Sequence, residues 1–168
     1  MFKVDIRDSA ELQDLVIALK GADKDIQQAV RAQSREVLVP IWQSAVTQRA
    51  ETVYEARLAG TARVAVSNQN VTMTAAKVRG QKFSGGLDLR ESWSTVERGA
   101  NLNKTATYQR RSKKGGTHSV TRQTMKPFRP RKAGGYVLSP AREEIGPRAT
   151  SLWVQTAIKT LLDKLDRK

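Results

Sequence analysis

The fold of this chain is decided first by residues 23 to 46, which read "DKDIQQAVRAQSREVLVPIWQSAV". The apolar residues keep helical spacing for about seven turns. They are Ile26, Val30, Val37, Leu38, Ile41, Trp42 and Val46. Asp23 is placed to cap the first turn. Pro40 is expected to kink or divide this long helix, because proline removes a backbone hydrogen bond and its ring collides with the preceding turn.

Two further helical segments lie on either side of it. Near the N-terminus, Asp8 and Glu11 have the spacing of a capping box, and an amphipathic pattern follows until Gly21. Its apolar positions are Leu12, Leu15, Val16 and Leu19. At the C-terminal end, residues 152 to 165 predict a final amphipathic helix. Its apolar positions are Leu152, Trp153, Val154, Ala157, Ile158, Leu161, Leu162 and Leu165.

The stretch that leads into the last helix reads "YVLSP", residues 136 to 140. It predicts a short strand closed by Pro140, which then opens a helical turn over "AREEI". Pro147 is expected to interrupt before the final helix. The tryptophans Trp42, Trp93 and Trp153 lie on predicted amphipathic faces, so we expect them to pack in the core.

The middle of the chain changes to strand-like periodicity beyond Gly60. Residues 61 to 66 and 71 to 78 are β-rich and are joined by polar turn residues at 67 to 70, which predicts a hairpin. We expect a loop over residues 80 to 90 and a third strand over "ESWSTVERG", residues 91 to 99.

A second hairpin is predicted from "TATYQRR" and "THSVTRQT", which alternate around a turn at residues 112 to 116. It has few large apolar residues, so we expect it to project from the core, and an extended Pro-Gly loop, "MKPFRPRKAGG", follows it. The fold class predicted is α+β over a single domain, residues 1 to 168. Helices from both ends pack on a small antiparallel sheet, and residues 101 to 136 form a basic hairpin and loop insertion.

Composition excludes most chemistry. The chain has 168 residues, no cysteine and one histidine, so disulfides, cysteine nucleophiles and thiolate metal sites are excluded, and almost nothing remains for a catalytic triad or a zinc site. His118 is a plain polar strand position. The glycine-rich stretches fit neither the P-loop nor the dinucleotide fingerprint. We expect a soluble protein, since no signal peptide or apolar span is found. Because no catalytic or cofactor motif is found, we also expect that it is no enzyme and uses no cofactor.

The positive charge is local. Net charge is +14, and residues 101 to 136 hold ten basic side chains and no acidic one, whereas the first fifty residues carry seven of each sign. Three interpretations stay open: a solvated face, contact with nucleic-acid phosphates, and docking on an acidic protein surface. Candidate contact residues on the hairpin are Arg110, Arg111, Lys113, Lys114 and Arg122. Lys126, Arg129, Arg131 and Lys132 would extend that contact.

Several stretches resemble the neck proteins of siphophages, the long-tailed bacteriophages. The basic "YQRRSKKGGTHSVTR" precedes "GGYVLSPAREEIGPRATSLWVQTAIKTLL", and "ALKGADKDI" stands at residues 18 to 26. The chain is most similar to the head-tail joining, tail-completion and tail-terminator group of actinobacteriophages. The residues that fit the last helix of that group are Pro147, Arg148, Leu152, Trp153, Val154 and Gln155.

The resemblance implies a structural virion protein, assembled in the host cytoplasm. It would form a homo-oligomeric ring, commonly six-fold, between the portal assembly and the tail tube. Portal, adaptor or stopper proteins and tail-tube proteins would be its partners, with double-stranded DNA in the lumen and no membrane. The insertion at residues 101 to 136 departs from the group and leaves the storey of the neck open. A rival interpretation is a monomeric nucleic-acid-binding module that uses residues 104 to 132.

Overall fold

The structure is a computed structural model that describes residues 10 to 76 and 88 to 166. Within these residues the fold is α+β, as predicted, with five helices and two separate two-stranded antiparallel sheets. The elements in chain order are α1 (Ala10–Gly21), α2 (Lys24–Thr47), α3 (Val53–Gly60), β1 (Arg63–Val66), β2 (Val71–Thr74), α4 (Leu89–Arg98), β3 (Thr105–Arg111), β4 (Thr117–Gln123) and α5 (Leu138–Leu165).

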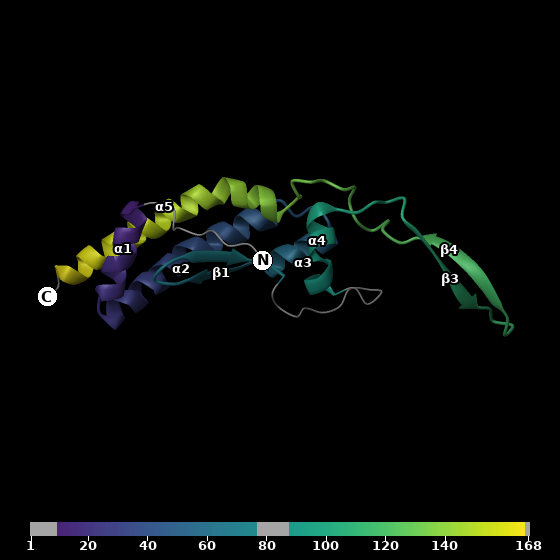
Figure 1. Cartoon of the computed structure of the whole chain (residues 1–168), viewed down its shortest axis with the longest axis horizontal. Coiled ribbons are helices and arrows are strands. Elements are labelled where there is room, and N and C mark those ends of the chain that lie inside the picture. Colours follow the sequence, from purple (N-terminus) through teal and green to yellow (C-terminus); the bar gives the residue numbers. More distant parts are fainter. Residues whose placement is uncertain (1–9, 77–87, 167–168) are drawn as a thin grey trace.

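The core lies where the two long helices, α2 and α5, run side by side along the body (Figure 1). Each helix buries a stripe of residues spaced by four, so the stripes face one another. On α2 the stripe is Ile26, Val30, Ser34, Leu38 and Trp42, and on α5 it is Ala141, Ile145, Ala149, Trp153 and Ala157. The alanines of α5 leave room for large neighbours. The core therefore forms mainly between helices, and the sheet on which we expected them to pack is only the small β1–β2 hairpin.

Both long helices continue through their prolines. Of the two outcomes expected at Pro40, a kink or a division, the division is wrong, and so is the interruption at Pro147, because α2 and α5 are continuous there. Both proline rings lie on the exposed side, where water can bond to the carbonyl that the missing N–H would have bonded. Buried residues before and after each ring, such as Leu38 and Trp42, hold the helix against the core.

The start of α5 also differs from the prediction. Residues 136 to 140 form no strand; Val137 is the N-cap, and the helix begins at Leu138. Pro140 therefore occupies the first turn, where a backbone N–H has no partner within the helix. Tertiary contacts at this helix start, described below, outweigh the β-propensity of "YVL".

The predicted hairpin at residues 61 to 78 is confirmed over residues 63 to 74. β1 and β2 are antiparallel, with Arg63 opposite Thr74 and Val66 opposite Val71, and Ser67 N donates to Asn70 O at 2.9 Å across the turn. This hairpin packs on α2. The expected cap at Asp8 and almost all of the expected loop at 80 to 90 lie outside the described residues.

Two short helices replace or add to the predicted elements. The strand expected over residues 91 to 99 is wrong, because this stretch belongs to α4, where Asp88 caps the first turn and Leu89, Trp93 and Val96 have helical spacing. Helix α3 was not predicted. It begins with a complete capping box between Thr52 and Glu55, a signal that the sequence contains.

Tryptophan burial supports the core prediction at two positions. Trp42 and Trp153 are buried in the main core. Trp93, on α4, is half-buried and packs in a second, smaller cluster of residues that includes parts of α3 and α4. α2 also begins where expected, although the Asp23 side chain makes no capping hydrogen bond.

Trp153→Ala is expected to lower the free energy of unfolding by about 3 to 5 kcal/mol, because it opens a cavity between the two long helices. Denaturant unfolding followed by circular dichroism measures this change. Leu162→Ala is the matched control on the same helix, since Leu162 is 55% exposed. Equal stability of Trp153→Ala and wild type would contradict the assignment of this helix pair as the core.

Candidate functional site

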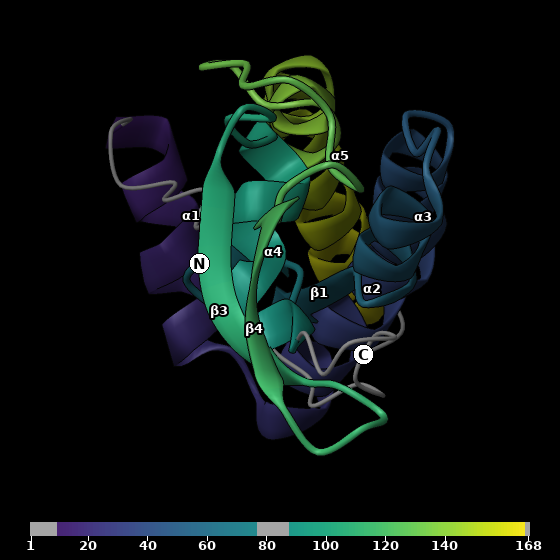
Figure 2. The same ribbon diagram turned by 90° about the vertical axis from the view of Figure 1, so that its right-hand side faces the viewer.

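The basic hairpin predicted from residues 105 to 124 is confirmed, and we call β3, β4 and their turn the arm (residues 105 to 123). The strands pair without a break, from Thr105 opposite Gln123 to Arg111 opposite Thr117. The turn closes through Ser112 N, which donates to Gly116 O at 2.7 Å. Seven residues at about 3.4 Å each give the strands of the arm a length of about 24 Å. It stands away from all the helices (Figure 1) and lies in front of them when seen from its own end (Figure 2).

The two faces of the arm differ in chemistry. Residues paired directly across an antiparallel ladder lie on the same face, and neighbours along a strand alternate. The hydroxyl face consists of Thr105, Thr107, Gln109, Arg111, Thr117, Ser119, Thr121 and Gln123. The aromatic face consists of Ala106, Tyr108, Arg110, His118, Val120 and Arg122. Lys113 and Lys114 lie in the turn between the strands.

The aromatic face combines an apolar centre with cations around it. Tyr108 lies directly opposite Val120 and is 45% exposed, and Ala106 and Val120 are half-buried. Arg110 and Arg122 flank this centre and are exposed. Tyrosine and arginine are enriched in the hot spots of protein interfaces. Sequence reasoning treated the hairpin as a uniform basic segment, although the strand alternation already contained this division.

The hydroxyl face has its own stabilising contact. The hydroxyl groups of Thr107 and Thr121 are 2.8 Å apart and share a hydrogen bond across the ladder. All but one of the side chains on this face are uncharged Thr, Ser or Gln, so the face is polar but nearly neutral. A two-stranded hairpin exposed on both sides is only marginally stable in water. The arm therefore depends on its root for position and on any surface that covers it for further stability.

The root of the arm, residues 98 to 104 and 124 to 132, is closed by backbone hydrogen bonds. Ala100 N donates to Arg129 O at 2.9 Å, Lys132 N to Arg98 O at 2.8 Å, and Thr124 N to Lys104 O at 3.0 Å. Gly99 has φ of +71°, and a Cβ there would lie 2.1 Å from Pro130 O. Only glycine fits this close approach of two chains, so Gly99 helps to fix the direction in which the arm leaves α4.

Four of the nine predicted contact residues belong to the root rather than to the arm. They are Lys126, Arg129, Arg131 and Lys132. Arg129 is engaged inside the chain: its Nη1 lies 3.2 Å from Glu51 Oε2 and 3.6 Å from Glu55 Oε1, and its guanidinium stacks 3.9 Å from the ring centre of Tyr136. Arg129 thus ties the returning chain to the capping box of α3. Arg110, Arg111, Lys113, Lys114 and Arg122 stay on the exposed arm.

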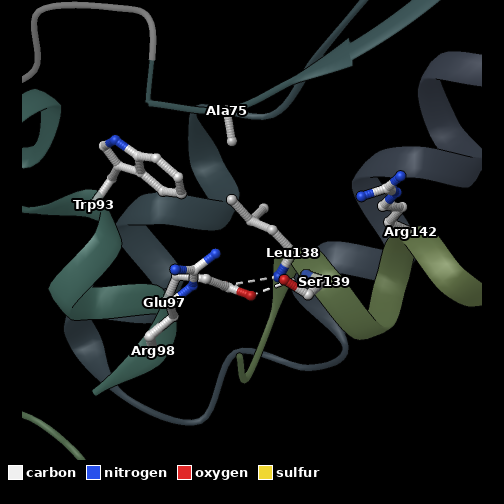
Figure 3. A pocket seen from close by; sticks show the side chains of 7 residues that line it. All are labelled: Ala75, Trp93, Glu97, Arg98, Leu138, Ser139 and Arg142. Atoms are coloured by element: carbon white, nitrogen blue, oxygen red, sulfur yellow. Dashed lines mark hydrogen bonds between the residues drawn. The ribbon is translucent and has the colours of Figure 1, made fainter. Parts of the chain in front are cut away.

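A buried carboxylate, Glu97, joins the end of α4 to the start of α5. Its Oε2 accepts a hydrogen bond from Leu138 N at 2.8 Å, and its Oε1 accepts one from Ser139 N at 2.9 Å (Figure 3). Oε2 also accepts a hydrogen bond from Val137 N at 3.2 Å. Glu97 is 1% exposed. It therefore supplies a cap that α5 lacks in its own sequence, and its negative charge lies at the positive end of the helix dipole.

The hollow beside this contact has a volume of about 230 Å³ (Figure 3). Trp93, Leu138 and Ala75 form its apolar wall, and the guanidinium groups of Arg98 and Arg142 form part of its rim. The Glu97 carboxylate, which also lines the hollow, accepts hydrogen bonds from three backbone donors at the start of α5.

No metal-binding cluster of His, Asp or Glu side chains occurs in residues 10 to 76 and 88 to 166. In the same part of the chain, no helix combines the length and apolar character needed to cross a membrane. No family model, curated protein or solved structure matches this chain. The arm and its root are therefore the features from which we infer a function.

Glu97→Ala is expected to lower the free energy of unfolding by about 3 kcal/mol, because it leaves three backbone N–H groups without their charged acceptor. Urea unfolding measures the change, and hydrogen exchange at residues 137 to 139 should accelerate together with it. The control is Glu91→Ala on the same helix, where the side chain is exposed and the expected change is within about 0.5 kcal/mol. Equal stability of the two variants would contradict the capping role.

Proposed function

We propose that this chain is a structural virion protein of a siphophage neck. Copies of it form a ring that joins the portal or head-completion assembly to the tail tube and lets the genome pass. The resemblance of its basic hairpin and C-terminal helix to the neck group suggests this setting. The observation that carries the proposal is the arm, which presents Tyr108 and Val120 between cations at a distance from the helical body.

Partner docking explains the arm better than phosphate contact does. Binding to phosphates needs cations alone and is indifferent to apolar groups. A protein interface needs an apolar centre that excludes water, with polar and charged groups at its rim. The aromatic face has this arrangement, since Arg110 and Arg122 surround the Tyr108–Val120 pair. We therefore propose that the face docks on an acidic protein surface with an apolar patch at its centre.

The place of the arm is consistent with a ring. The arm extends from one end of the elongated body, so the surface that it contacts belongs to another molecule (Figure 1). A contact between two different surfaces of identical subunits forms a closed ring when the rotation between neighbours closes. Docking on a neighbouring copy or on the ring above or below is compatible with this geometry. The resemblance to the neck group suggests six-fold symmetry.

The experiment compares two variants that remove the same charge. Arg110→Gln/Arg122→Gln changes the aromatic face, and Arg111→Gln/Lys113→Gln changes the hydroxyl face and the turn. Joining of purified heads and tails that lack this protein measures activity. We expect the first variant to lose at least about thirtyfold, equivalent to about 2 kcal/mol at a hot spot, and the second less than about threefold. Added salt should weaken the wild-type activity, since exposed charge pairs are screened within about 8 to 10 Å.

Electron microscopy of the assembled wild type should show closed rings of this protein at the head-tail joint. Equal losses from both variants would favour the rival nucleic-acid-binding module, whose contact depends on charge alone. Full activity of both variants, or a single copy per virion by quantitative mass spectrometry, would contradict the neck proposal.

A further inference from the structure

A second hollow lies at the root of the arm, apart from both arm faces. Its volume is about 290 Å³, and three segments form it. Helix α4 contributes Ser94, Thr95 and Arg98, the outgoing chain contributes Asn101 and Lys104, and the returning chain contributes Arg131. Arg98 also lines the hollow shown in Figure 3, so this residue borders both hollows.

The charge around this hollow is positive. Arg98, Lys104 and Arg131 all line it, and no acidic residue does. Within the described ranges, none of these three side chains pairs with a carboxylate. Glu91 lies about one turn earlier on α4 than Ser94 and Thr95 and does not line the hollow. Three cations near one another repel, and a bound anion would relieve that repulsion.

The polar groups here are donors. The side-chain oxygen of Asn101 already accepts a hydrogen bond from Asn103 N at 3.1 Å, which leaves its NH₂ group to donate. The hydroxyls of Ser94 and Thr95 have no hydrogen-bond partner among the described residues. The residues that line this one space thus include two arginines, a lysine, an asparagine and two hydroxyl residues. An oxyanion with several acceptor oxygens matches this set.

The root also fixes the backbone that carries these side chains before any ligand arrives. The bonds from Ala100 N to Arg129 O and from Lys132 N to Arg98 O set the two chains on either side of Arg131. Lys104 N donates to Asn101 O at 3.2 Å, which closes the turn between the two residues from the outgoing chain. Backbone positions fixed in this way lower the ordering cost of binding.

We propose that this hollow binds a phosphate group. Guanidinium groups suit phosphate because they give paired, charged hydrogen bonds, and the space exceeds the share of one water, about 30 Å³, severalfold. Two sources offer the same chemistry: the backbone of a DNA duplex that passes the arm, and a free phosphate or phosphate ester. The site does not require the arm to dock, so it extends the proposed function without depending on it.

The test uses the full chain with two probes, pyrophosphate and a mixed-sequence DNA duplex, in isothermal titration calorimetry. Arg98→Gln/Lys104→Gln removes two cations of the hollow. Arg35→Gln/Arg90→Gln removes two exposed cations that line none of the hollows described here and is the matched control. We expect the first variant to lose at least about tenfold in affinity for pyrophosphate and the control to stay within about twofold. Arg131→Gln, in the loop, checks the result if the α4 variant folds poorly.

The duplex titration distinguishes the two sources. Binding of both probes assigns the hollow to the DNA backbone if the Arg98→Gln/Lys104→Gln variant also shows a weaker salt dependence for the duplex. The slope of log affinity against log salt should then become shallower by about 0.9 for each phosphate that the variant no longer neutralises. Binding of pyrophosphate alone assigns it to a free phosphate or ester. Absence of saturable binding by either probe would overturn the proposal, as would equal losses in the control. Joining activity that is intact in the Arg98→Gln/Lys104→Gln variant would leave the neck proposal standing.

Discussion

The contact between the Glu97 carboxylate and the first backbone N–H groups of α5 holds the end of α4, from which the arm extends, against the long-helix core. Glu97 lies in the last turn of α4, just before the chain leaves for the arm. Residues 137 to 139 form the start of α5, where the chain comes back from the arm. One buried carboxylate thus joins the chain before the arm to the chain after it. A Cβ on Gly135 would lie 2.2 Å from Glu97 Oε1, so the approach also requires glycine at that position. Without this clamp, α5 would start with uncapped donors, and the chain that returns from the arm would lose a tie to α4.

The molecule divides its stability and its contacts between separate regions. The α2–α5 pair buries Trp42 and Trp153 and supplies the apolar core, whereas the arm is exposed on both faces. Five of the ten basic side chains of residues 101 to 136 lie on the exposed arm, away from the helical body. The other five lie in the root, and among them Arg129 pairs with Glu51 and Glu55 and so connects the root to α3. A basic segment can therefore contain both structural cations and free ones, and only the free ones are suited to bind a partner.

Sequence periodicity predicted the elements with local signals. The long N-terminal helix and the basic hairpin follow from regular spacing, and the hairpin turn follows from Gly115 and Gly116. Helix α4 was mistaken for a strand because Trp, Thr and Val favour strands, although Asp88 and the spacing of Leu89, Trp93 and Val96 favour a helix. Pro147 does not interrupt α5 because its ring faces solvent, which sequence alone does not reveal. The Glu97 clamp and the Arg129 pairs join residues that lie far apart in the sequence, so no local pattern predicts them. The two faces of the arm, in contrast, could have been predicted from strand alternation.

We infer above all that the aromatic face of the arm contacts another protein molecule in the assembled particle. A photo-crosslinking amino acid at position 108 tests this inference directly, with the same amino acid at position 109, on the hydroxyl face, as the control. After irradiation of assembled particles, we predict that position 108 crosslinks to a neighbouring subunit or a partner ring several times more efficiently than position 109. Crosslinks from position 108 only to its own chain or to DNA, or equal yields from both positions, would contradict the inference.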